Sequence, residues 1–246
     1  MKGKPLRGRA TAPQHGVARA ISKLGLGSRT QAAAWVRDGR VRVNARVVRD
    51  AEFPTRVGID RIEIDGRAAE AARRCVLMLN KPRGLVTTAQ DDQGRATVYD
   101  CLAGATLPWL APIGRLDKAS EGLLLFSNDP VWAAGITDPD SGPTKTYHVQ
   151  INRLPDAALL TALKVGVHSK GESLKASTAR ALRSGDKNAW LEIVLEEGRN
   201  RQIRRLLQAL DVSVLRLVRV AIGSLLLGDL AKGRWRLLTQ AEIDAL

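Results

Sequence analysis

Cysteine and histidine are scarce in this chain of 246 residues, which contains only Cys75, Cys101 and three histidines. The cysteines lie far apart without CxxC spacing and the histidines are scattered, so the sequence predicts neither a disulfide framework nor a zinc site. No nucleotide-binding glycine motif is present either. We therefore expect no metal and no cofactor. Aromatic residues make up only 4% of the chain, which leaves few candidates for stacking on a ligand.

Long apolar runs are also missing. No run approaches the roughly 20 residues that a membrane span requires. The first residues, MKGKPLRGRATAPQHG, lack the apolar core of a secretory signal. We expect a cytoplasmic protein that has no membrane partner.

Acidic residues are too few to balance the basic ones, since 25 Asp and Glu stand against 39 Lys and Arg, a net charge of +14. Residues 1–70 hold 15 basic and 7 acidic side chains, and so carry +8 of this excess. Such a balance indicates a polyanionic partner, with nucleic acid as the first candidate. Residues 1–15 are basic and aperiodic and are expected to form a flexible arm that touches phosphates.

Residues 16–72 have the pattern of a small α/β domain, with two short helices followed by a β-element. Ser28 and Gln31 are spaced as a capping box at the start of the second helix, and Gly39 ends it. The stretches VRVNARVV and RIEIDG alternate apolar and polar residues, as strands do, and the first contains a turn at residues 44–45.

This order of elements resembles the RNA-binding domain named after the small-subunit ribosomal protein S4; the matching residues are Gly25, Ser28, Arg29, Ala32, Gly39, Arg40, Val41, Val43 and Asn44. Ala45 departs from the glycine expected there, and because a left-handed alanine is costly we expect a different turn type. Four arginines crowd the second helix and the adjoining strand. They either solvate the surface or, as we favour, line an RNA phosphate path: Arg29, Arg37, Arg40 and Arg42.

Residues 73–246 form the second predicted domain, after the polar linker AEAARR. Strand-like runs fall at 75–80, 123–127, 144–151, 178–183, 190–196, 214–220 and 234–238, and helical stretches fall near 156–164, 201–210 and 239–245. Groups of strands with few helices between them favour an α+β fold with a mostly antiparallel sheet.

The stretch GRLDKASEGLLLFSND, residues 114–129, places Asp117 on a loop before a buried strand. Taken alone, an aspartate that accepts backbone hydrogen bonds in a turn explains it. In RNRQIRRLLQAL, residues 199–210, apolar residues recur as on a helix with one buried face. A rotation of about 100° per residue puts Arg204 beside that face, where it can reach an acid, and Arg205 on the far side, toward solvent or RNA.

Four motifs in this order, behind the S4-like domain, resemble the bacterial ribosomal-RNA pseudouridine synthases that modify a single uridine: NKPRG at 80–84, GRLDKASEGLLLFSND at 114–129, KTYHV at 145–149 and EGRNRQIRRLL at 197–207. The resemblance covers about residues 16 to 240. It implies that the bond from ribose to the uracil nitrogen breaks, the base turns, and C5 rejoins the same sugar. No cofactor is required for this isomerisation.

The resemblance also implies roles for individual residues. Asp117 is the catalytic carboxylate, as nucleophile or as base, and Tyr147 stacks on the flipped uracil, although a packed core tyrosine is the alternative. Burial disfavours a charged carboxylate, and a paired Arg204 would offset that cost. Further candidates for RNA or substrate contacts, beside the four arginines of the first domain, are Lys81, Arg115, Lys145, Arg199, Arg201, Arg205 and Leu215. Core packing explains Leu215 equally well, and simple solvation explains Lys81 almost as well.

Two other functions compete with this interpretation. A non-catalytic RNA-binding or ribosome-assembly factor would need the charge but not Asp117. A nucleoside hydrolase would need a second carboxylate for water, and the nearest acid, Glu121, is expected to be exposed in its turn. We expect a monomer that acts on ribosomal RNA, with a lean toward the large subunit that rests on the resemblance alone.

Overall fold

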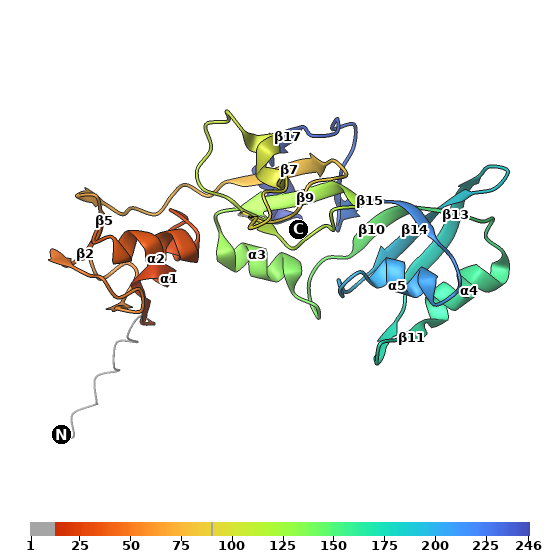
Figure 1. The fold of residues 1–246 in the computed structure, drawn as a ribbon, viewed down its shortest axis with the longest axis horizontal. Coiled ribbons are helices and arrows are strands. Elements are labelled where there is room, and N and C mark those ends of the chain that lie inside the picture. Colours follow the sequence, from red (N-terminus) through yellow and green to blue (C-terminus); the bar gives the residue numbers. More distant parts are fainter. Residues whose placement is uncertain (1–12, 90) are drawn as a thin grey trace, which may run out of the picture. The chain divides into compact units, whose positions relative to one another are not determined.

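The chain divides into two compact units, coloured along the sequence in Figure 1. The computed structural model describes residues 13–89 and 91–246, so residues 1–12, most of the predicted basic arm, lie outside the described residues. The first unit runs to Arg74 and includes Leu107–Leu110, and the second comprises Cys75–Thr106 and Ala111–Leu246. Within the described ranges, no helix is long and apolar enough to cross a membrane.

The first unit packs two short helices against a small sheet. Its elements are β1 (His15–Gly16), α1 (Val17–Lys23), α2 (Arg29–Arg37), β2 (Val41–Val43), β3 (Arg46–Val47), β4 (Pro54–Thr55), β5 (Ile62–Ile64) and β6 (Arg67–Ala68). The sheet order is β3-β2-β5-β6, and β1 pairs with β4. The capping box of Ser28 and Gln31 is present, as predicted. Val17, Ile21, Val36 and Val41 are fully buried in the core.

The turn between β2 and β3 differs from the expectation. Asn44 and Ala45 both adopt left-handed backbone conformations, with φ of 49° and 66°. The turn thus keeps the geometry that favours glycine and places an alanine in it. Asn44 compensates in part, because its side chain accepts a hydrogen bond from the Arg61 amide at 2.9 Å and donates one to Asp60 at 3.1 Å.

The second unit is built on one large sheet. Its elements are β7 (Val76–Lys81), the 3-10 helix η1 (Val98–Leu102), β8 (Ala111–Ile113), β9 (Glu121–Ser127), α3 (Pro130–Thr137), β10 (Lys145–Ile151), α4 (Ala157–Val165), β11 (Val167–Ser169), β12 (Glu172–Leu174), β13 (Thr178–Ser184), β14 (Ala189–Leu195), α5 (Gln202–Gln208), β15 (Val214–Ile222), β16 (Leu225–Leu226), β17 (Trp235–Leu237) and α6 (Gln240–Asp244).

The main strand order of this sheet is β13-β14-β10-β15-β9-β7-β17, and all its pairings are antiparallel except that of β15 with β9. The predicted α+β class with a mostly antiparallel sheet is therefore confirmed. The parallel pairing joins Val218 to Glu121 and Arg219 to Gly122. It unites two antiparallel half-sheets, with α4 and α5 lying near β13, β14 and β10 in Figure 1.

The central strands β7 and β9 are buried along their whole length, because both faces of the sheet are covered there. On one face Val76, Met78, Leu123 and Leu125 share a core cluster with Ile136 of α3. Strand β10 instead alternates buried and half-buried residues. The loop that precedes β9 is therefore attached to a strand that is buried along its whole length.

Candidate active site

Asp117 lies on the loop between β8 and β9, residues 114–120. Gly114 and Gly122, at either end, have φ of 67° and 101°, a region that side chains with a Cβ rarely adopt. Thr87 fastens the loop by donating its hydroxyl to the Leu116 carbonyl at 2.8 Å. These constraints fix where the Asp117 backbone sits.

Lys81 also anchors this loop, through hydrogen bonds to its backbone. Its side chain is fully buried at the end of β7, and Nζ donates hydrogen bonds to the carbonyl oxygens of Asp117 (3.2 Å), Ser120 (2.9 Å) and Pro82 (3.1 Å). Burial lowers the pKa of Lys81 to about 8, while the nearby charge of Asp117 acts in the opposite direction. Neither predicted role was correct, because the ammonium is inaccessible both to solvent and to a phosphate.

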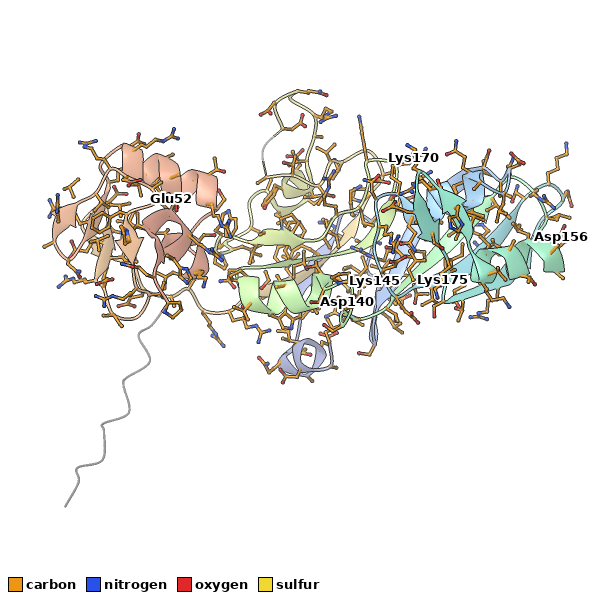
Figure 2. The ribbon with its side chains drawn as sticks, turned by 90° about the horizontal axis from the view of Figure 1, so that it is seen from below. Glu52, Asp140, Lys145, Asp156, Lys170 and Lys175 are labelled. Atoms are coloured by element: carbon orange, nitrogen blue, oxygen red, sulfur yellow. The ribbon has the colours of Figure 1, made fainter. Side chains whose placement is uncertain are left out.

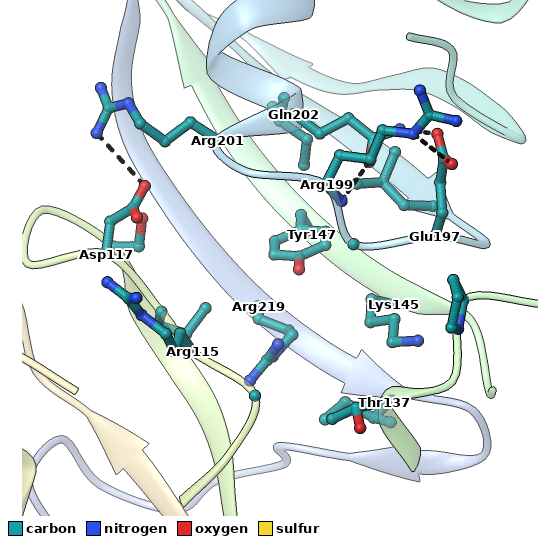
Figure 3. A pocket seen from close by; sticks show the side chains of 18 of the residues that line it. Arg115, Asp117, Thr137, Lys145, Tyr147, Glu197, Arg199, Arg201, Gln202 and Arg219 are labelled. Carbon is teal, nitrogen blue, oxygen red and sulfur yellow. Dashed lines mark hydrogen bonds and ion pairs between the residues drawn. The ribbon is translucent and has the colours of Figure 1, made fainter. Parts of the chain in front are cut away.

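The Asp117 carboxylate opens onto a cavity of about 510 Å³ (Figure 3). Tyr147 of β10 stands in the middle of this cavity, and Ile203, Leu217 and Ile222 supply apolar walls. The side chain of Asp117 is 31% exposed, which leaves it accessible from the cavity without placing it in bulk solvent. The cavity thus combines a carboxylate, an aromatic ring and an apolar surface.

Arg201 is the ion-pair partner of Asp117, at 3.5 Å between Nη1 and Oδ2. The predicted pairing with Arg204 was wrong: its Nη2 donates to the Ala119 carbonyl at 3.2 Å, and its buried Nε has no partner among the described residues. Arg201 precedes α5 in a left-handed conformation, φ 49°, so its direction does not follow the helical rotation used in the prediction. Burial and the charge of Arg201 lower the pKa of Arg204, and Asp117 opposes that shift.

Tyr147 and Val149 share the buried face of β10, and His148 points to the other face beside Glu192 at 3.5 Å, as their alternation predicts. Tyr147 is 9% exposed and pairs in register with Arg219 of β15. Its hydroxyl points into the cavity in Figure 3. The ring therefore combines a packed body with an accessible end.

The remaining candidates around the cavity divide into two groups. Residues that line it are Arg115, Lys145, Arg199 and Arg201. Arg205 and Leu215 do not line it. Leu215 was therefore wrongly expected in the pocket wall, and the expectation that Arg205 faces solvent was wrong because its side chain is 11% exposed. The Arg205 guanidinium binds the β11–β12 hairpin, through Glu172 at 2.5 Å and the Ser169 carbonyl. Leu215 is 42% exposed near the start of β15, and Leu217, two residues further on, lines the cavity in its place.

Glu121 is buried, at 3% exposure, whereas the sequence led us to expect it in solvent. It begins β9, and Arg216 contacts both of its oxygens at 3.1 Å while Lys232 contacts one at 2.6 Å. These two cations lower the pKa of Glu121 against the effect of burial. Glu121 is absent from the residues that line the described cavity.

Among the residues that line the cavity, Arg219 and Asp140 were not predicted as site residues. Arg219 is buried, at 5% exposure. Asp140 precedes β10 and lies near Lys145 in Figure 2. The alternation of β15 places Arg219 on the same face as Leu217 and was the signal that pointed to it.

In the first unit, Arg29, Arg37 and Arg42 are exposed. Arg40 is partly neutralised, because it pairs with Asp65 at 2.5 Å and stacks over Trp35 at 5.6 Å. Across both units, the described residues contain no cluster of three or more His, Cys, Asp or Glu side chains that could hold a metal ion.

Comparison with known families identifies both units. Residues 75–209 match the model of RNA pseudouridylate synthases, and residues 17–58 match the S4 domain. An RNA pseudouridine synthase of Aquifex aeolicus, itself uncharacterized, is 34% identical over 92% of this chain and 91% of its own length. Ribosomal large subunit pseudouridine synthase B of Bacillus subtilis is also 34% identical, over 92% and 93%. The protein of that name from Pseudomonas aeruginosa is 36% identical, but the match covers 60% of it. A crystal structure of a pseudouridylate synthase superposes with a TM-score of 0.65 at 30% identity, covering 94% of this chain and 99% of that one.

Proposed function

Because the chain belongs to the RNA pseudouridylate synthase family, we propose that it converts a uridine of ribosomal RNA to pseudouridine in the cavity beside Asp117. The names of the relatives from Bacillus subtilis and Pseudomonas aeruginosa favour the large subunit. We place the enzyme in the cytoplasm, where ribosomal RNA is found, and take it to act as a monomer.

One observation carries the assignment of the site: a carboxylate on an anchored loop shares a cavity with an aromatic ring, and part of the cavity wall is apolar. Asp117 is the proposed catalytic residue, acting on the ribose of a nucleotide flipped out of the RNA. Arg201 pairs with the carboxylate, and the unpartnered Nε of Arg204 lies in the same neighbourhood as a second source of positive charge. Tyr147 supplies the surface on which the uracil rests.

The exposed cations at the mouth suit the RNA backbone. Arg115, Arg199 and Arg201 line the cavity, and their side chains are exposed, so they can contact phosphates. The first unit adds Arg29, Arg37 and Arg42 as a proposed RNA contact. Specificity for one uridine would then arise from RNA shape read by both units.

Hydrolysis is the less favoured reaction. The second carboxylate considered for it, Glu121, is fixed by Arg216 and Lys232 and is not among the residues of the cavity wall. Incubation with RNA should therefore release no free uracil.

The test is to map pseudouridine across ribosomal RNA from cells with and without the gene, and to complement the deletion with wild type or Asp117→Asn. We expect one modification to vanish in the deletion and not return with Asp117→Asn, which removes the charge and keeps the shape. The purified variant should lose about 10²-fold to 10⁴-fold in rate or more and still bind RNA. Asp186→Asn, in the exposed loop after β13, is the matched control and should restore the modification. Unchanged turnover by Asp117→Asn would refute the catalytic assignment and favour a non-catalytic RNA-binding factor.

A further inference from the structure

Two buried cations, Arg219 and Lys145, form the wall of the cavity behind Tyr147. They are 5% and 9% exposed. Arg219 is the register partner of Tyr147 across β15 and β10, and Lys145 lies two residues before Tyr147 on the same face. In Figure 3 the Tyr147 hydroxyl points toward the gap between the two cations.

Neither cation has an anionic partner among the residues that the structure describes. Arg219 Nε donates to the Leu123 carbonyl at 2.7 Å, but its buried Nη2 has no hydrogen-bond partner there. The ammonium of Lys145 makes no hydrogen bond or ion pair among the described contacts. Burial and then the charge of Arg219 lower the pKa of Lys145, and Asp138 partly opposes them.

Such an arrangement is costly unless a ligand completes it. Removing charges from water without pairing them is unfavourable. Asp117 does not relieve the cost, because its carboxylate is paired with Arg201. An electron-rich ligand between Arg219 and Lys145 would supply the missing acceptor.

The proposed reaction, on which this inference rests, creates such a ligand. When the bond from C1′ to N1 breaks, its electron pair remains on the base, whether Asp117 attacks C1′ or removes a sugar proton. The resulting negative charge is shared by N1, O2 and O4 of the uracil. In the later steps C5 bonds to C1′ while the Asp117–C1′ bond breaks or, in the other route, the sugar proton returns. The C5 proton then leaves and N1 takes up a proton, so the detached base is anionic only between the two bond changes.

We propose that Arg219 and Lys145 bind the carbonyl edge of the uracil and stabilise the negative charge that it carries after detachment. Fixed donors in a site that excludes water are most effective where charge develops during a reaction. Arg219 and Lys145 are thus assigned to the leaving base, while Asp117 acts on the sugar.

A phosphate of the RNA backbone is the competing ligand for these cations. The surroundings favour the base: Tyr147, Ile203 and Leu217 provide aromatic and apolar surfaces next to Arg219 and Lys145. Phosphates can instead bind the exposed cations that line the cavity, Arg115, Arg199 and Arg201. The two ligands can be distinguished because only the base changes charge during catalysis.

The experiment compares Lys145→Met and Arg219→Lys on two unmodified transcripts of ribosomal RNA, one made with uridine and one with 5-fluorouridine. Fluorine at C5 withdraws electrons and makes the detached base more stable as an anion. With enzyme in excess, the single-turnover loss of the parent nucleoside measures bond cleavage on both RNAs. We expect the rate of bond cleavage by each variant to fall about 10²-fold to 10³-fold on uridine. On 5-fluorouridine the fall in rate should be smaller by a factor of at least about ten, and the RNA affinity should stay that of the wild type.

The matched control is Arg115→Gln, which removes an exposed cation of the same cavity. It should weaken RNA binding and slow both substrates equally. If Lys145→Met behaves like Arg115→Gln, the proposal is overturned in favour of a phosphate contact. If Lys145→Met loses no rate, Lys145 has no role in catalysis and the proposal is overturned as well. Lys145→Met leaves no group unpaired, so its thermal unfolding midpoint should equal that of the wild type. If Arg219→Lys fails to fold, the result with Lys145→Met alone tests the proposal. If wild-type enzyme converts neither RNA, the proposed function itself fails.

Discussion

Lys81 is a charged residue at a position that is otherwise typical of an apolar core. Its neighbours in β7, Leu77 to Leu79, are fully buried like Lys81 itself. Three backbone carbonyl oxygens converge on its ammonium, two of them from the loop that carries Asp117. The ammonium therefore replaces water as the donor for these carbonyl groups.

We predict that Lys81→Met destabilises the protein by about 2 to 5 kcal/mol, because three buried acceptors lose their donor. The effect should depend on pH. The pKa of Lys81 is about 8 in the folded protein against an ordinary 10.5, so between these values the unfolded chain binds more protons. The stability of wild type relative to Lys81→Met is then constant below about pH 8 and rises toward pH 10.5.

Denaturant unfolding of both proteins across this pH range measures the difference. Lys164→Met, at an exposed position of α4, is the matched control and should show no such slope. A difference that stays flat from neutral pH to about 10.5 would contradict the lowered pKa of Lys81 in the folded protein.

At this scale the sequence predicted some residues well and others poorly. The position of Asp117 next to β9 and the inward direction of Tyr147 followed from local spacing and alternation. The partners of Lys81 and Glu121 did not, because each depends on segments distant in the chain. The pairing of Asp117 with Arg204 was inferred from regular rotation along the helix, whereas the observed partner, Arg201, lies one residue before α5 begins and has a left-handed backbone.

Among the elements, the parallel pairing of β9 with β15 imposes the strictest steric requirement on a single residue. Gly122 pairs with Arg219 in the parallel ladder, and its φ is 101°. A Cβ at this position would lie 2.8 Å from the Arg219 nitrogen and closer still to its carbonyl oxygen. The two half-sheets can approach each other here only because the side chain is absent.

We predict that Gly122→Ala is more destabilising than Gly84→Ala by at least about 2 kcal/mol. Gly84 has the same φ of 101° but open space where a Cβ would lie, so it isolates the backbone strain, roughly 1 to 3 kcal/mol. The excess at Gly122 comes from the clash with Arg219. Equal losses in the unfolding free energy of the two variants would mean that β15 can shift away from β9 at little cost.

Strands that carry their own alternation, such as 145–151, were predictable, and so was the capping box of α2. Helix α3 was missed although Asp129 caps it and Pro130 opens it, because its eight residues lack a clear apolar stripe. The parallel pairing of β15 with β9 left no local signal, since only tertiary packing brings those segments together.

For the molecule as a whole, the net charge of +14 matters more for RNA affinity than any one contact. Binding that neutralises phosphates weakens with salt in proportion to the number of contacts. Replacing Arg29, Arg37 and Arg42 together by Gln should weaken RNA binding and reduce the slope of log affinity against log salt by about 2.

A second triple variant, at Arg56, Arg61 and Arg67, removes the same charge from the same unit and serves as control. These arginines lie near Asp60, Glu63 and Asp65, which already offset them. Its slope should change by less than about 1. Equal changes in the two triple variants would show that α2 and β2 respond to net charge only and do not form an RNA-binding face.

Strand β15 also affects how this enzyme can be made. It bridges β10 and β9 in the sheet order of the described residues, and it begins only at Val214. A nascent chain emerging from the ribosome thus carries two half-sheets with open edges until residues 214–222 have been translated. Products of premature termination before that strand cannot join the two half-sheets or complete the cavity, and their open strand edges are exposed to chaperones and proteases.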